Sequence, residues 1–594
     1  MSKSSSRTAR KLLARGISYQ QAGRTTLADE CFRSALKVNP QCAEALRRRG
    51  VIALGARRYR EAVGFTSAAL ALNPDDPETL LSLADSYQTQ GDVEKALRYY
   101  RRAVELRPDS AEAYSKIGEA EELILELEAA TEAYRRALAL QPGSAEAHCK
   151  LGYVLRRRHE YPEALKLYER ALTLDPERAD SYADLALIHT DMGNKEAAKE
   201  AFARALALKP DSSRTALTLS YFHFKSADVP VAAEWLRRAI ELDPSQPLAH
   251  LSLGSMLSIM EDWEGALACY ERSRVLCPCS ADTTFYLGLL HLSHGNFALG
   301  WEEYEQREEA RRLRKAFSEP QWKGEPLEGA RIFLHAEQGL GDTLLAVRYV
   351  PLVAARGGQV VLAVQQRLHR LLAHTEGARQ VITDGGTVSD LKWQCPLLSL
   401  PRAFGTDSNS IPAKVPYIYA DPELAEAWRE RMPATSLRVG LVWGGDPKHS
   451  QNFRRIIPLE VLAPLTYLEG TTFYSLQMGP PAEQIKQLGE RVRLIDLQNE
   501  QRDFADTAAI VANLDLVISI DTSVAHLAGA MGKPVWILLF KSPDWRWLLE
   551  REDSPWYPTA RLCRQSTLGK WGDVVARVRE ELRKAVTRAV TSDE

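Results

Sequence analysis

Small residues, alanines and prolines recur at fixed positions through the first half of the chain. At a period of 34 residues, three columns stay in register over most of this half. Gly118, Ala130 and Pro142 occupy the three columns in one repeat, and the same columns recur 34 residues later. Apolar residues between them follow helical spacing. The pattern predicts pairs of amphipathic helices that touch at the small residues, with proline ending the second helix of each pair.

This period and punctuation are typical of tetratricopeptide repeats, which stack as helix pairs into a superhelix with a concave groove. About nine repeats fit residues 8–312. The last repeat departs from the pattern, because Gly300 replaces the alanine and Arg312 the proline. Its second helix, residues 299–307, is amphipathic and is expected to dock on the region that follows.

The groove is predicted to bind a protein partner. O-GlcNAc transferases carry an asparagine ladder two positions before the small residue, and this chain does not. That column here is Ala14, Arg48, Ser82, Lys116, Lys150, Asp184, Thr218, Ser252 and Tyr286. A mixed polar surface of this kind suits one or a few partners. A passive spacer or an oligomerisation arm is the alternative, and the oligomeric state stays open.

Short apolar runs alternate with amphipathic segments in the second half, which is typical of parallel sheets covered by helices. Strands are expected at residues 331–336, 359–364, 381–382, 395–401, 437–443, 472–477, 494–497, 514–520 and 535–540. A helix is expected at 342–355 and another at 366–373, and residues 412–433 read as an interdomain segment. The pattern predicts a linker at 313–330, one α/β lobe at 331–420, a second at 436–565 and a C-terminal helix at 570–590.

Composition narrows the class of protein. A formal net charge of −2 over 594 residues gives no bulk attraction to nucleic acid or to an anionic membrane. The N-terminal residues lead into no apolar signal core, and no apolar run is long enough to span a bilayer. The eight cysteines form no zinc-binding set. We expect a cytoplasmic protein with reduced thiols.

A polar turn between two apolar runs near the end of the chain is the strongest candidate for a binding site. Its residue types begin helices, and a helix start presents free N–H groups and a positive dipole end to an anion. A plain helix cap with a half-buried histidine is the alternative. The residues expected to bind the anion are Asp521, Thr522, Ser523, Val524 and His526.

The pattern Asp-Thr-x-x-x-His-Leu-Ala-Gly-Ala at 521–530 resembles the donor-phosphate motif of glycosyltransferase family 9, the heptosyltransferase-like family. A similar Thr-rich helix start holds the nucleotide diphosphate in O-GlcNAc transferases. The resemblance implies a GT-B fold, with two facing Rossmann-like domains and a nucleotide-sugar donor. It also implies that the C-terminal helix crosses back onto the first lobe.

The turn after the first α/β strand carries Gly339, Gly341 and Asp342. It resembles the Gly-Asp turn of family 9 enzymes, in which the aspartate is the proposed catalytic base. The glycines would let the backbone approach a sugar, and the helix dipole would favour the Asp342 anion. A simple N-cap is the alternative for Asp342. A dinucleotide-binding turn is disfavoured, because Leu344 stands where its third glycine would be.

The first strand of the second lobe leads into glycines and basic residues, as phosphate-facing loops do. Gly444, Lys448 and Arg455 lie there, and Arg455 precedes Ile-Ile-Pro-Leu, which resembles the Arg-Ser-Ile-Pro-Leu stretch of the family. Lys448 and Arg455 are expected to offset the diphosphate charge, with a solvated loop lysine as the alternative for Lys448. Gln477, at the end of the next strand, is expected to touch the base or ribose.

Aromatic residues follow the last predicted strand, and they are Trp545, Trp547, Trp556 and Tyr557. They could stack on a base or a sugar. Packing beneath a loop is the preferred interpretation, because large aromatics dominate protein cores.

Together these features predict an all-α tetratricopeptide superhelix followed by an α/β GT-B module. The expected function is inverting, metal-independent transfer of a sugar from a nucleotide-sugar donor to a protein Ser or Thr, with no cofactor. Bacterial flagellin glycosyltransferases combine repeats and a GT-B lobe in a similar way, so flagellin is one candidate acceptor. A lipopolysaccharide-type sugar transferase and a non-catalytic repeat scaffold are the alternatives.

Overall fold

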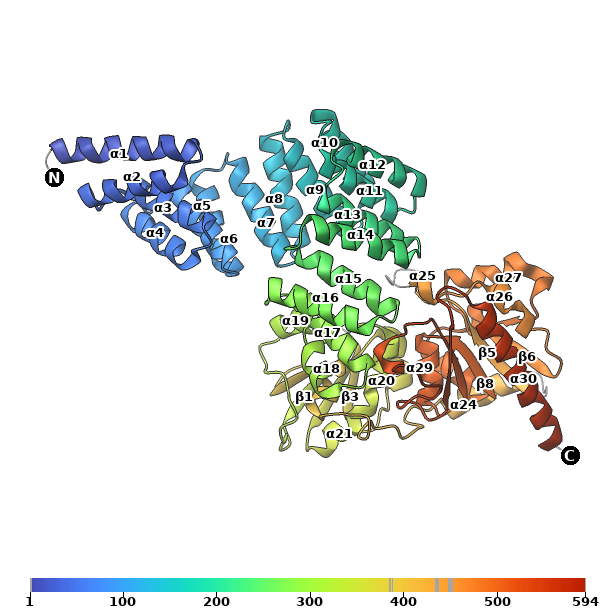
Figure 1. The fold of residues 1–594 in the computed structure, drawn as a ribbon. Helices are drawn as coiled ribbons and strands as arrows, with labels where there is room; N and C mark the ends of the chain where they lie inside the picture. Colours follow the sequence, from blue (N-terminus) through green and yellow to red (C-terminus); the bar gives the residue numbers. More distant parts are fainter. Residues whose placement is uncertain (1–2, 384–385, 387, 433–436, 447–451, 593–594) are drawn as a thin grey trace. The chain divides into compact units, whose positions relative to one another are not determined.

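The computed structural model of the 594-residue chain describes residues 3–383, 386, 388–432, 437–446 and 452–592 (Figure 1). The chain divides into two compact units, residues 1–222 and 223–594. Within the described residues, no helix combines the length and the apolar character needed to cross a bilayer.

The first unit is built of helices that pack as consecutive pairs, which confirms the helix pairs predicted from the period. Its helices are α1 (Lys3–Gln21), α2 (Thr25–Val38), α3 (Ala43–Gly55), α4 (Tyr59–Leu72), α5 (Pro77–Thr89), α6 (Val93–Leu106), α7 (Ala111–Leu123), α8 (Leu127–Leu140), α9 (Ala145–Arg157), α10 (Tyr161–Leu174), α11 (Ala179–Asp191), α12 (Lys195–Leu208) and α13 (Ser213–Lys225), whose end enters the second unit.

The column of small residues explains how the two helices of a pair approach. A Cβ atom placed on Gly118 would lie 2.6 Å from the Tyr134 ring, and one on Gly152 would lie 2.8 Å from the Tyr168 ring. Both tyrosines are fully buried. The glycine therefore makes room for a ring from the second helix of the same repeat.

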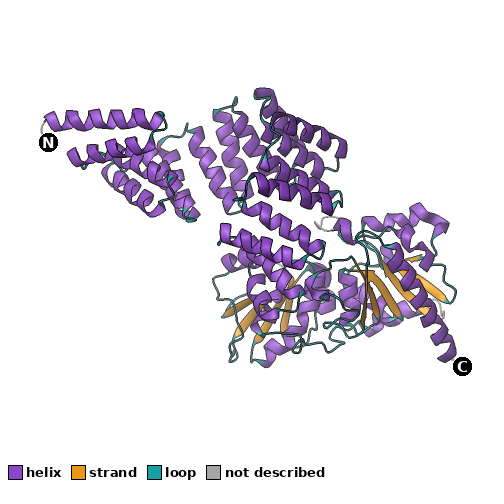
Figure 2. Cartoon of the chain, in the orientation of Figure 1, coloured by secondary structure: helices purple, strands orange, loops and turns teal. Residues whose placement is uncertain are grey.

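The second unit begins with further repeat helices, and all the strands follow them in the chain (Figure 2). These helices are α14 (Val229–Leu242), α15 (Pro247–Ile259), α16 (Trp263–Leu276), α17 (Ala281–Ser293), α18 (Phe297–Tyr304) and α19 (Glu308–Ala316). The Trp301 indole Nε1–H donates to the Thr406 carbonyl oxygen at 2.7 Å, and the Trp301 and Trp545 rings meet edge to face at 5.1 Å. The predicted docking of the last repeat is confirmed.

The first sheet forms the first lobe, residues 331–403, and all its strand pairs are parallel in the order β3-β2-β1-β4. Its elements are β1 (Arg331–His335), α20 (Leu340–Ala346), η1 (Val347–Tyr349), α21 (Val350–Ala355), β2 (Gln359–Val364), α22 (Gln366–Leu372), β3 (Ala378–Thr383), β4 (Trp393–Pro396), η2 (Leu397–Ser399) and α23 (Leu400–Ala403).

Two predicted elements of this lobe differ from the structure, and proline accounts for both. The single helix expected at 342–355 is broken into α20, η1 and α21, because Pro351 fits only the first turn of a helix. The strand expected at 395–401 ends at Pro396, and the chain then turns into η2 and α23, where Pro401 again lies in a first turn.

The second sheet is also parallel, in the order β10-β9-β8-β5-β6-β7, and belongs to the second lobe, residues 437–592. Its elements, with the preceding helix α24 (Pro422–Arg431), are β5 (Leu437–Val442), α25 (Asn452–Arg455), α26 (Leu459–Leu462), η3 (Ala463–Leu465), β6 (Thr471–Ser475), η4 (Pro480–Ala482), α27 (Glu483–Leu488), η5 (Gly489–Arg491), β7 (Ile495–Asp496), η6 (Gln498–Glu500), α28 (Phe504–Ala512), β8 (Leu516–Ile520), α29 (Ser523–Ala530), β9 (Val535–Leu539), η7 (Trp545–Trp547), β10 (Ala560–Arg564) and α30 (Gly572–Ser592).

The C-terminal helix α30 does not cross onto the first lobe, so that expectation was wrong. Trp571, just before the helix, together with Val574, Val578 and Leu582, shares a core with β5, β6, β8 and α26 of the second lobe. The apolar face of α30 is already covered there, which leaves no reason for it to cross. Residues 412–432 instead join the lobes, since the Tyr417 N–H donates to the Ala530 carbonyl oxygen of the second lobe at 3.0 Å and the Tyr417 hydroxyl donates to the Leu344 carbonyl oxygen of the first at 2.9 Å.

A single hydrophobic core runs from the last repeat through the first sheet to α28 and α29. Trp301, Trp322, Leu344, Ala528 and Trp545 are all buried members of it. This shared core fixes the last repeat and both lobes as parts of one folding unit.

Candidate functional site

Asp342 lies in the first turn of α20, and both of its carboxylate oxygens have partners. Oδ2 accepts the backbone N–H of Gly339 at 2.8 Å. Asp342 therefore stabilises the start of α20 from a position inside its first turn. It is therefore not the N-cap itself, which is Gly339. Oδ1 accepts from Nη2 of Arg546, which comes from the second lobe. The Asp342 side chain stays 19% exposed, so solvent reaches the carboxylate.

The predicted anion site also begins a helix, as expected. Thr522 is the N-cap of α29, and its side chain makes no capping hydrogen bond; its hydroxyl lies 3.0 Å from that of Ser519 instead. Ser523 and Val524 form the first helical positions, with Ser523 partly exposed. The first N–H groups of α29 therefore receive no cap from the Thr522 side chain, which leaves them suited to an anion.

The starts of α20 and α29 meet head to head, and Gly341 is the point of contact. A Cβ atom placed on Gly341 would lie 2.7 Å from Cδ2 of His526 and 3.5 Å from Cα of Ser523. A larger residue at position 341 would clash with the buried His526 ring. The structure thus places Gly341 of the first lobe against Ser523 and His526 of the second.

These helix starts lie where ligands bind in open parallel sheets. In the first sheet the chain moves from β1 to β2 and β3 on one side and to β4 on the other. In the second sheet it moves from β5 to β6 and β7 on one side and to β8, β9 and β10 on the other. Ligands favour the carboxyl ends of strands at such switch points. Asp342 follows β1, and Asp521 follows β8.

Acidic and basic side chains cluster near the start of α29, with Asp521 and Arg546 buried and Arg455 and Asp544 half-buried. Nη2 of Arg455 lies 3.7 Å from Oδ2 of Asp521, and Nη1 of Arg546 donates to Oδ1 of Asp544 at 2.6 Å. Burial raises the pKa of Asp521 against the opposing effect of Arg455. Burial acts in the same direction on Asp544, but Arg546 and Arg455 outweigh it and lower the pKa of Asp544.

His526 is buried and uncharged. Burial, reinforced by the neighbouring Arg546, lowers its pKa to about 3. Its Nδ1 lies 2.9 Å from the Tyr557 hydroxyl, and its ring stacks on Trp547 at 5.3 Å. Its Nε2 lies 3.9 Å from Oδ1 of Asp521. A neutral imidazole at the start of α29 can direct a hydrogen bond without adding charge.

Gln477 and Gly444 bind each other. Oε1 of Gln477 accepts the N–H groups of Trp443 at 3.1 Å and Gly444 at 2.7 Å, and its Nε2 donates to the Gly444 and Met478 carbonyl oxygens. A Cβ atom on Gly444 would meet Pro481 at 2.6 Å. The geometry shows Gln477 fixing the turn after β5, and a contact with a base or ribose stays a prediction. Lys448, the other predicted basic residue of this loop, lies outside the described residues.

The aromatic residues after the last predicted strand pack as a core, which agrees with the preferred interpretation. Trp545, Trp547, Trp556 and Tyr557 are each at most 2% exposed. Trp545 meets Trp301 and Tyr304 of the last repeat and Trp556 of its own lobe.

Sequence reasoning missed Asp544 and Arg546, because the stretch Asp-Trp-Arg-Trp was considered only for its aromatic rings. An arginine flanked by two tryptophans just after a buried strand was the available signal. The partner of Arg546 could not be found, since Asp342 is 204 residues away in the chain.

A second missed feature lies behind the Gly339 turn. Arg307 of the last repeat is fully buried and binds both carboxylate oxygens of Glu337, at 2.6 and 2.9 Å. It also donates to Glu305 at 3.1 Å and to the Ser399 hydroxyl at 2.8 Å. Glu337 lies two residues after the end of β1, so this network fixes the start of the turn that leads to Asp342.

The polar column of the first unit is held by ion pairs between neighbouring repeats. Lys150 lies 2.8 Å from Glu119, and Lys116 lies 3.3 Å from Asp85. Asp184 accepts Nη2 of Arg214 at 2.7 Å. These side chains lie on the first helices of successive repeats and carry opposite charges rather than amides.

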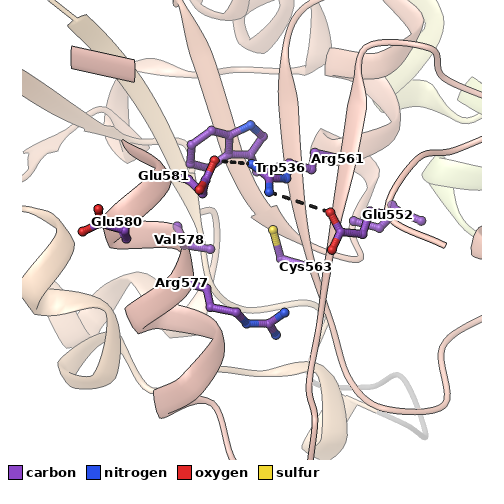
Figure 3. Close-up of a pocket in the computed structure, with 9 residues that line it drawn as sticks. Trp536, Glu552, Arg561, Cys563, Arg577, Val578, Glu580 and Glu581 are labelled. Atoms are coloured by element: carbon purple, nitrogen blue, oxygen red, sulfur yellow. Dashed lines mark hydrogen bonds and ion pairs between the residues drawn. The ribbon is translucent and has the colours of Figure 1, made fainter. Parts of the chain in front are cut away.

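One shallow pocket lies elsewhere, among β9, β10 and α30, and holds about 180 Å³ (Figure 3). Arg561 lies in it between Glu581 at 2.7 Å and Glu552 at 3.8 Å. The volume is below the roughly 300–1,000 Å³ of small-molecule sites. Its lining includes none of the residues predicted from the sequence. Among the described residues, no group of three His, Cys, Asp or Glu could hold a metal ion, and the metal-independent reaction stays a prediction.

The repeats match known protein families. Residues 13–77 and 81–145 match one tetratricopeptide-repeat family, and residues 151–220 match a second. The N-terminal region is built of tetratricopeptide repeats. The chain is similar to protein FlbA of Caulobacter vibrioides, with 29% identity over 363 residues. That alignment covers 56% of this chain and 60% of FlbA, so the chain spans less than two thirds of this relative.

Among solved structures, the chain is similar to the MamA protein, with 28% identity, a TM-score of 0.27, and coverage of 28% of this chain and 92% of MamA. A tetratricopeptide repeat protein from Parabacteroides merdae matches with 17% identity and a TM-score of 0.38, covering 42% of this chain and 99% of that protein.

Proposed function

We propose that this protein is a glycosyltransferase that moves a sugar from a nucleotide-sugar donor to a Ser or Thr of a protein bound by its tetratricopeptide repeats. The observation that carries the proposal is the meeting of the α20 and α29 starts at Gly341 and His526. It brings an aspartate of one lobe next to an anion-binding helix start of the other. Such a meeting of two lobes supports the GT-B fold that the resemblance to glycosyltransferase family 9 implies.

The donor diphosphate is assigned to the start of α29. The N–H groups at Ser523 and Val524, the positive end of the helix dipole and the Arg455 guanidinium favour an anion there. Charge on the leaving diphosphate is then offset by protein groups, and the reaction proceeds without a metal ion. Lys448 remains a further candidate for this role.

Asp342 is assigned as the general base. The acceptor hydroxyl oxygen attacks the anomeric carbon, its proton passes to the Asp342 carboxylate, and the bond from that carbon to the diphosphate oxygen breaks with inversion. The partial exposure of the Asp342 side chain and its place at the carboxyl end of β1 support this role.

The repeats are assigned the binding of the protein acceptor. Stacked helix pairs offer a long surface for a protein chain, and the paired charges of the first unit suit one or a few acceptors. Flagellin is a candidate acceptor through the resemblance to bacterial flagellin glycosyltransferases. The heptosyltransferase-like alternative, with a lipid-linked sugar as acceptor, gives the repeats no such role.

A non-catalytic repeat scaffold is the second candidate, and one observation favours it. Both oxygens of the Asp342 carboxylate accept hydrogen bonds from the protein, one from Arg546 and one from the Gly339 N–H, rather than from an acceptor hydroxyl. In a scaffold the same contacts would serve only to join the two lobes.

The test is donor hydrolysis with a panel of nucleotide sugars, with and without EDTA. We expect the full-length protein to release nucleoside diphosphate slowly from one donor, and EDTA to leave the rate unchanged. Asp342→Asn should abolish release, while Asp553→Asn, at an exposed aspartate that also pairs with an arginine, should not. Release from no donor would favour the scaffold, and a strict metal requirement would contradict the assigned charge compensation.

A further inference from the structure

Arg546 is the side chain that ties the second lobe to the candidate base. Its Nη1 donates to Oδ1 of Asp544 at 2.6 Å, and its backbone N–H donates to the same oxygen at 3.1 Å. Its Nη2 donates to Oδ1 of Asp342. Arg546 is only 6% exposed, and its Nε–H is buried with no hydrogen-bond partner among the described residues. A buried donor left unpaired is costly and points to a partner that binds there.

The two ends of the guanidinium are held unequally. Asp544 lies two residues away in the same turn and accepts both a side-chain and a backbone hydrogen bond from Arg546. The turn itself is fixed, because the Trp545 ring packs on Trp301 and Tyr304 of the last repeat. Asp342, by contrast, belongs to the other lobe. The Nη1 end is therefore anchored, whereas Nη2 can exchange its partner and Nε–H can gain one.

The charges around the α29 start call for such an exchange. Asp342, Asp521 and Asp544 share the guanidinium groups of Arg455 and Arg546. A diphosphate that binds beside them brings further negative charge. A guanidinium that turns from a carboxylate to a phosphate oxygen would offset this charge, and its planar fork of donors suits a phosphate well.

We propose that Arg546 exchanges between the Asp342 carboxylate and a diphosphate bound at the start of α29, so that diphosphate binding releases Asp342. The inference rests on the proposed donor site. It accounts for the held carboxylate that favours a scaffold, since Asp342 becomes a free base only when the donor is present. Arg546 then contacts the leaving group, and Asp544 is its positioning residue.

The test measures binding of inorganic pyrophosphate by calorimetry, which requires neither the right nucleotide nor turnover. Arg546→Gln should weaken pyrophosphate binding by about 10- to 100-fold, as for the loss of a charge-assisted hydrogen bond. Asp342→Asn should strengthen it, because Arg546 no longer has to leave a carboxylate. In the Arg546→Gln background most of that gain should vanish. The gain in affinity from Asp342→Asn should be roughly 3- to 100-fold larger with arginine than with glutamine at position 546.

The double-mutant cycle separates exchange from simple repulsion. Removing the Asp342 charge would help any nearby anion, but that gain would be equal with Arg546 or Gln at position 546. Equal gains in the two backgrounds, or full pyrophosphate affinity in Arg546→Gln, would overturn the exchange and leave the donor site standing. No pyrophosphate binding in the wild-type protein, or binding that survives Arg455→Gln, would remove the donor site and the exchange together.

Two further variants test whether a loss of pyrophosphate binding comes from misfolding. Arg546→Lys keeps the charge but not the fork of donors, so it should bind pyrophosphate more weakly than the wild type and more tightly than Arg546→Gln. Arg551→Gln, at a more exposed arginine that pairs with Asp553, should bind as the wild type does. Circular dichroism and the thermal unfolding midpoint would confirm that each variant is folded.

Discussion

The same two repeat positions make different contacts in an internal repeat and in the last repeat. In the repeat that contains Gly152, the glycine makes room for the Tyr168 ring of its own repeat. In the last repeat the residues 16 apart are again glycine and tyrosine, Gly288 and Tyr304, but a Cβ atom on Gly288 would meet the Tyr304 backbone nitrogen at 2.7 Å. The two helices approach more closely, and the Tyr304 ring packs instead against Phe285, Trp301 and Trp545.

This difference shows how a repeat becomes part of another domain. Repeats of the first unit satisfy their aromatic residues locally, so each depends mainly on its neighbours. The last repeat gives its aromatic ring and Arg307 to the α/β lobes, and takes Thr406 and Glu337 as partners. The boundary in folding therefore lies within the repeats, and the region that supports the candidate site includes repeat helices.

The largest expected effect separates chemistry from binding. Asp342→Asn should lower kcat by ~10²–10⁴-fold, because the general base is lost while the repeats are untouched. The measurement is steady-state transfer to a protein acceptor, with Asp553→Asn as the control. Full turnover by Asp342→Asn would return this residue to a role in closing the helix start.

Removal of the first unit should have the next largest effect. A chain that begins at residue 227 keeps α14 to α30 and should still hydrolyse the donor, because its core lies within the second unit. Transfer to the protein acceptor should fall by about 10²-fold or more, because the effective concentration given by a bound partner is lost. Equal transfer by the truncated and full-length chains would favour the lipid-sugar alternative.

A further truncation that also removes α14 to α18 would sharpen the comparison. It deletes the Trp301 and Tyr304 contacts and should leave the lobes insoluble or unfolded, since these rings are fully buried in the shared core. A soluble, cooperatively folding product would show that the last repeat is not part of that unit. Circular dichroism and thermal unfolding provide the measurement.

The buried His526 should make the second unit sensitive to acid. Its pKa is lowered to about 3, whereas an unfolded histidine titrates near ~6.5. Between these values the unfolded chain binds a proton that the folded chain does not. The free energy of unfolding should therefore fall as pH falls through this window, by at most about 1.4 kcal/mol per pH unit.

His526→Gln should remove that part of the pH dependence, as measured by urea unfolding between pH 4 and 7. The exposed His374→Gln serves as the matched control. An unchanged pH dependence in His526→Gln would mean that His526 is protonated in the folded protein as readily as in the unfolded one.

The smallest effect tests the two glycines directly. Gly288→Ala should destabilise the protein by about 1–3 kcal/mol, because the added Cβ meets backbone that cannot move aside. Gly152→Ala should stay within about 1 kcal/mol of the wild type, since a ring can shift and alanine gains helix propensity. Ala84 and Ala186 already occupy this column in other repeats. Equal costs at the two glycines would remove the distinction between local and shared repeats.

The sequence by itself determined those helices and strands that depend on residues close together in the chain. The 34-residue columns predicted the helix pairs, because side-chain size and proline act over a few residues. The apolar runs predicted β1, β2, β5, β8 and β9, because strands buried on both faces need continuous apolar residues. The helix start at Thr522 followed from its capping residue types alone.

Only the tertiary structure decided which of these elements meet. The short edge strand β10 and the helices α24 and α28 carry no strong periodic signal and were not predicted. The position of α30 depends on which core covers its apolar face. The partners of Arg546, Arg307 and Gly341 come from distant parts of the chain, and no local pattern encodes a contact between residues 204 apart. Such contacts arise when long loops close, and their free energy belongs to the folded arrangement rather than to any one segment.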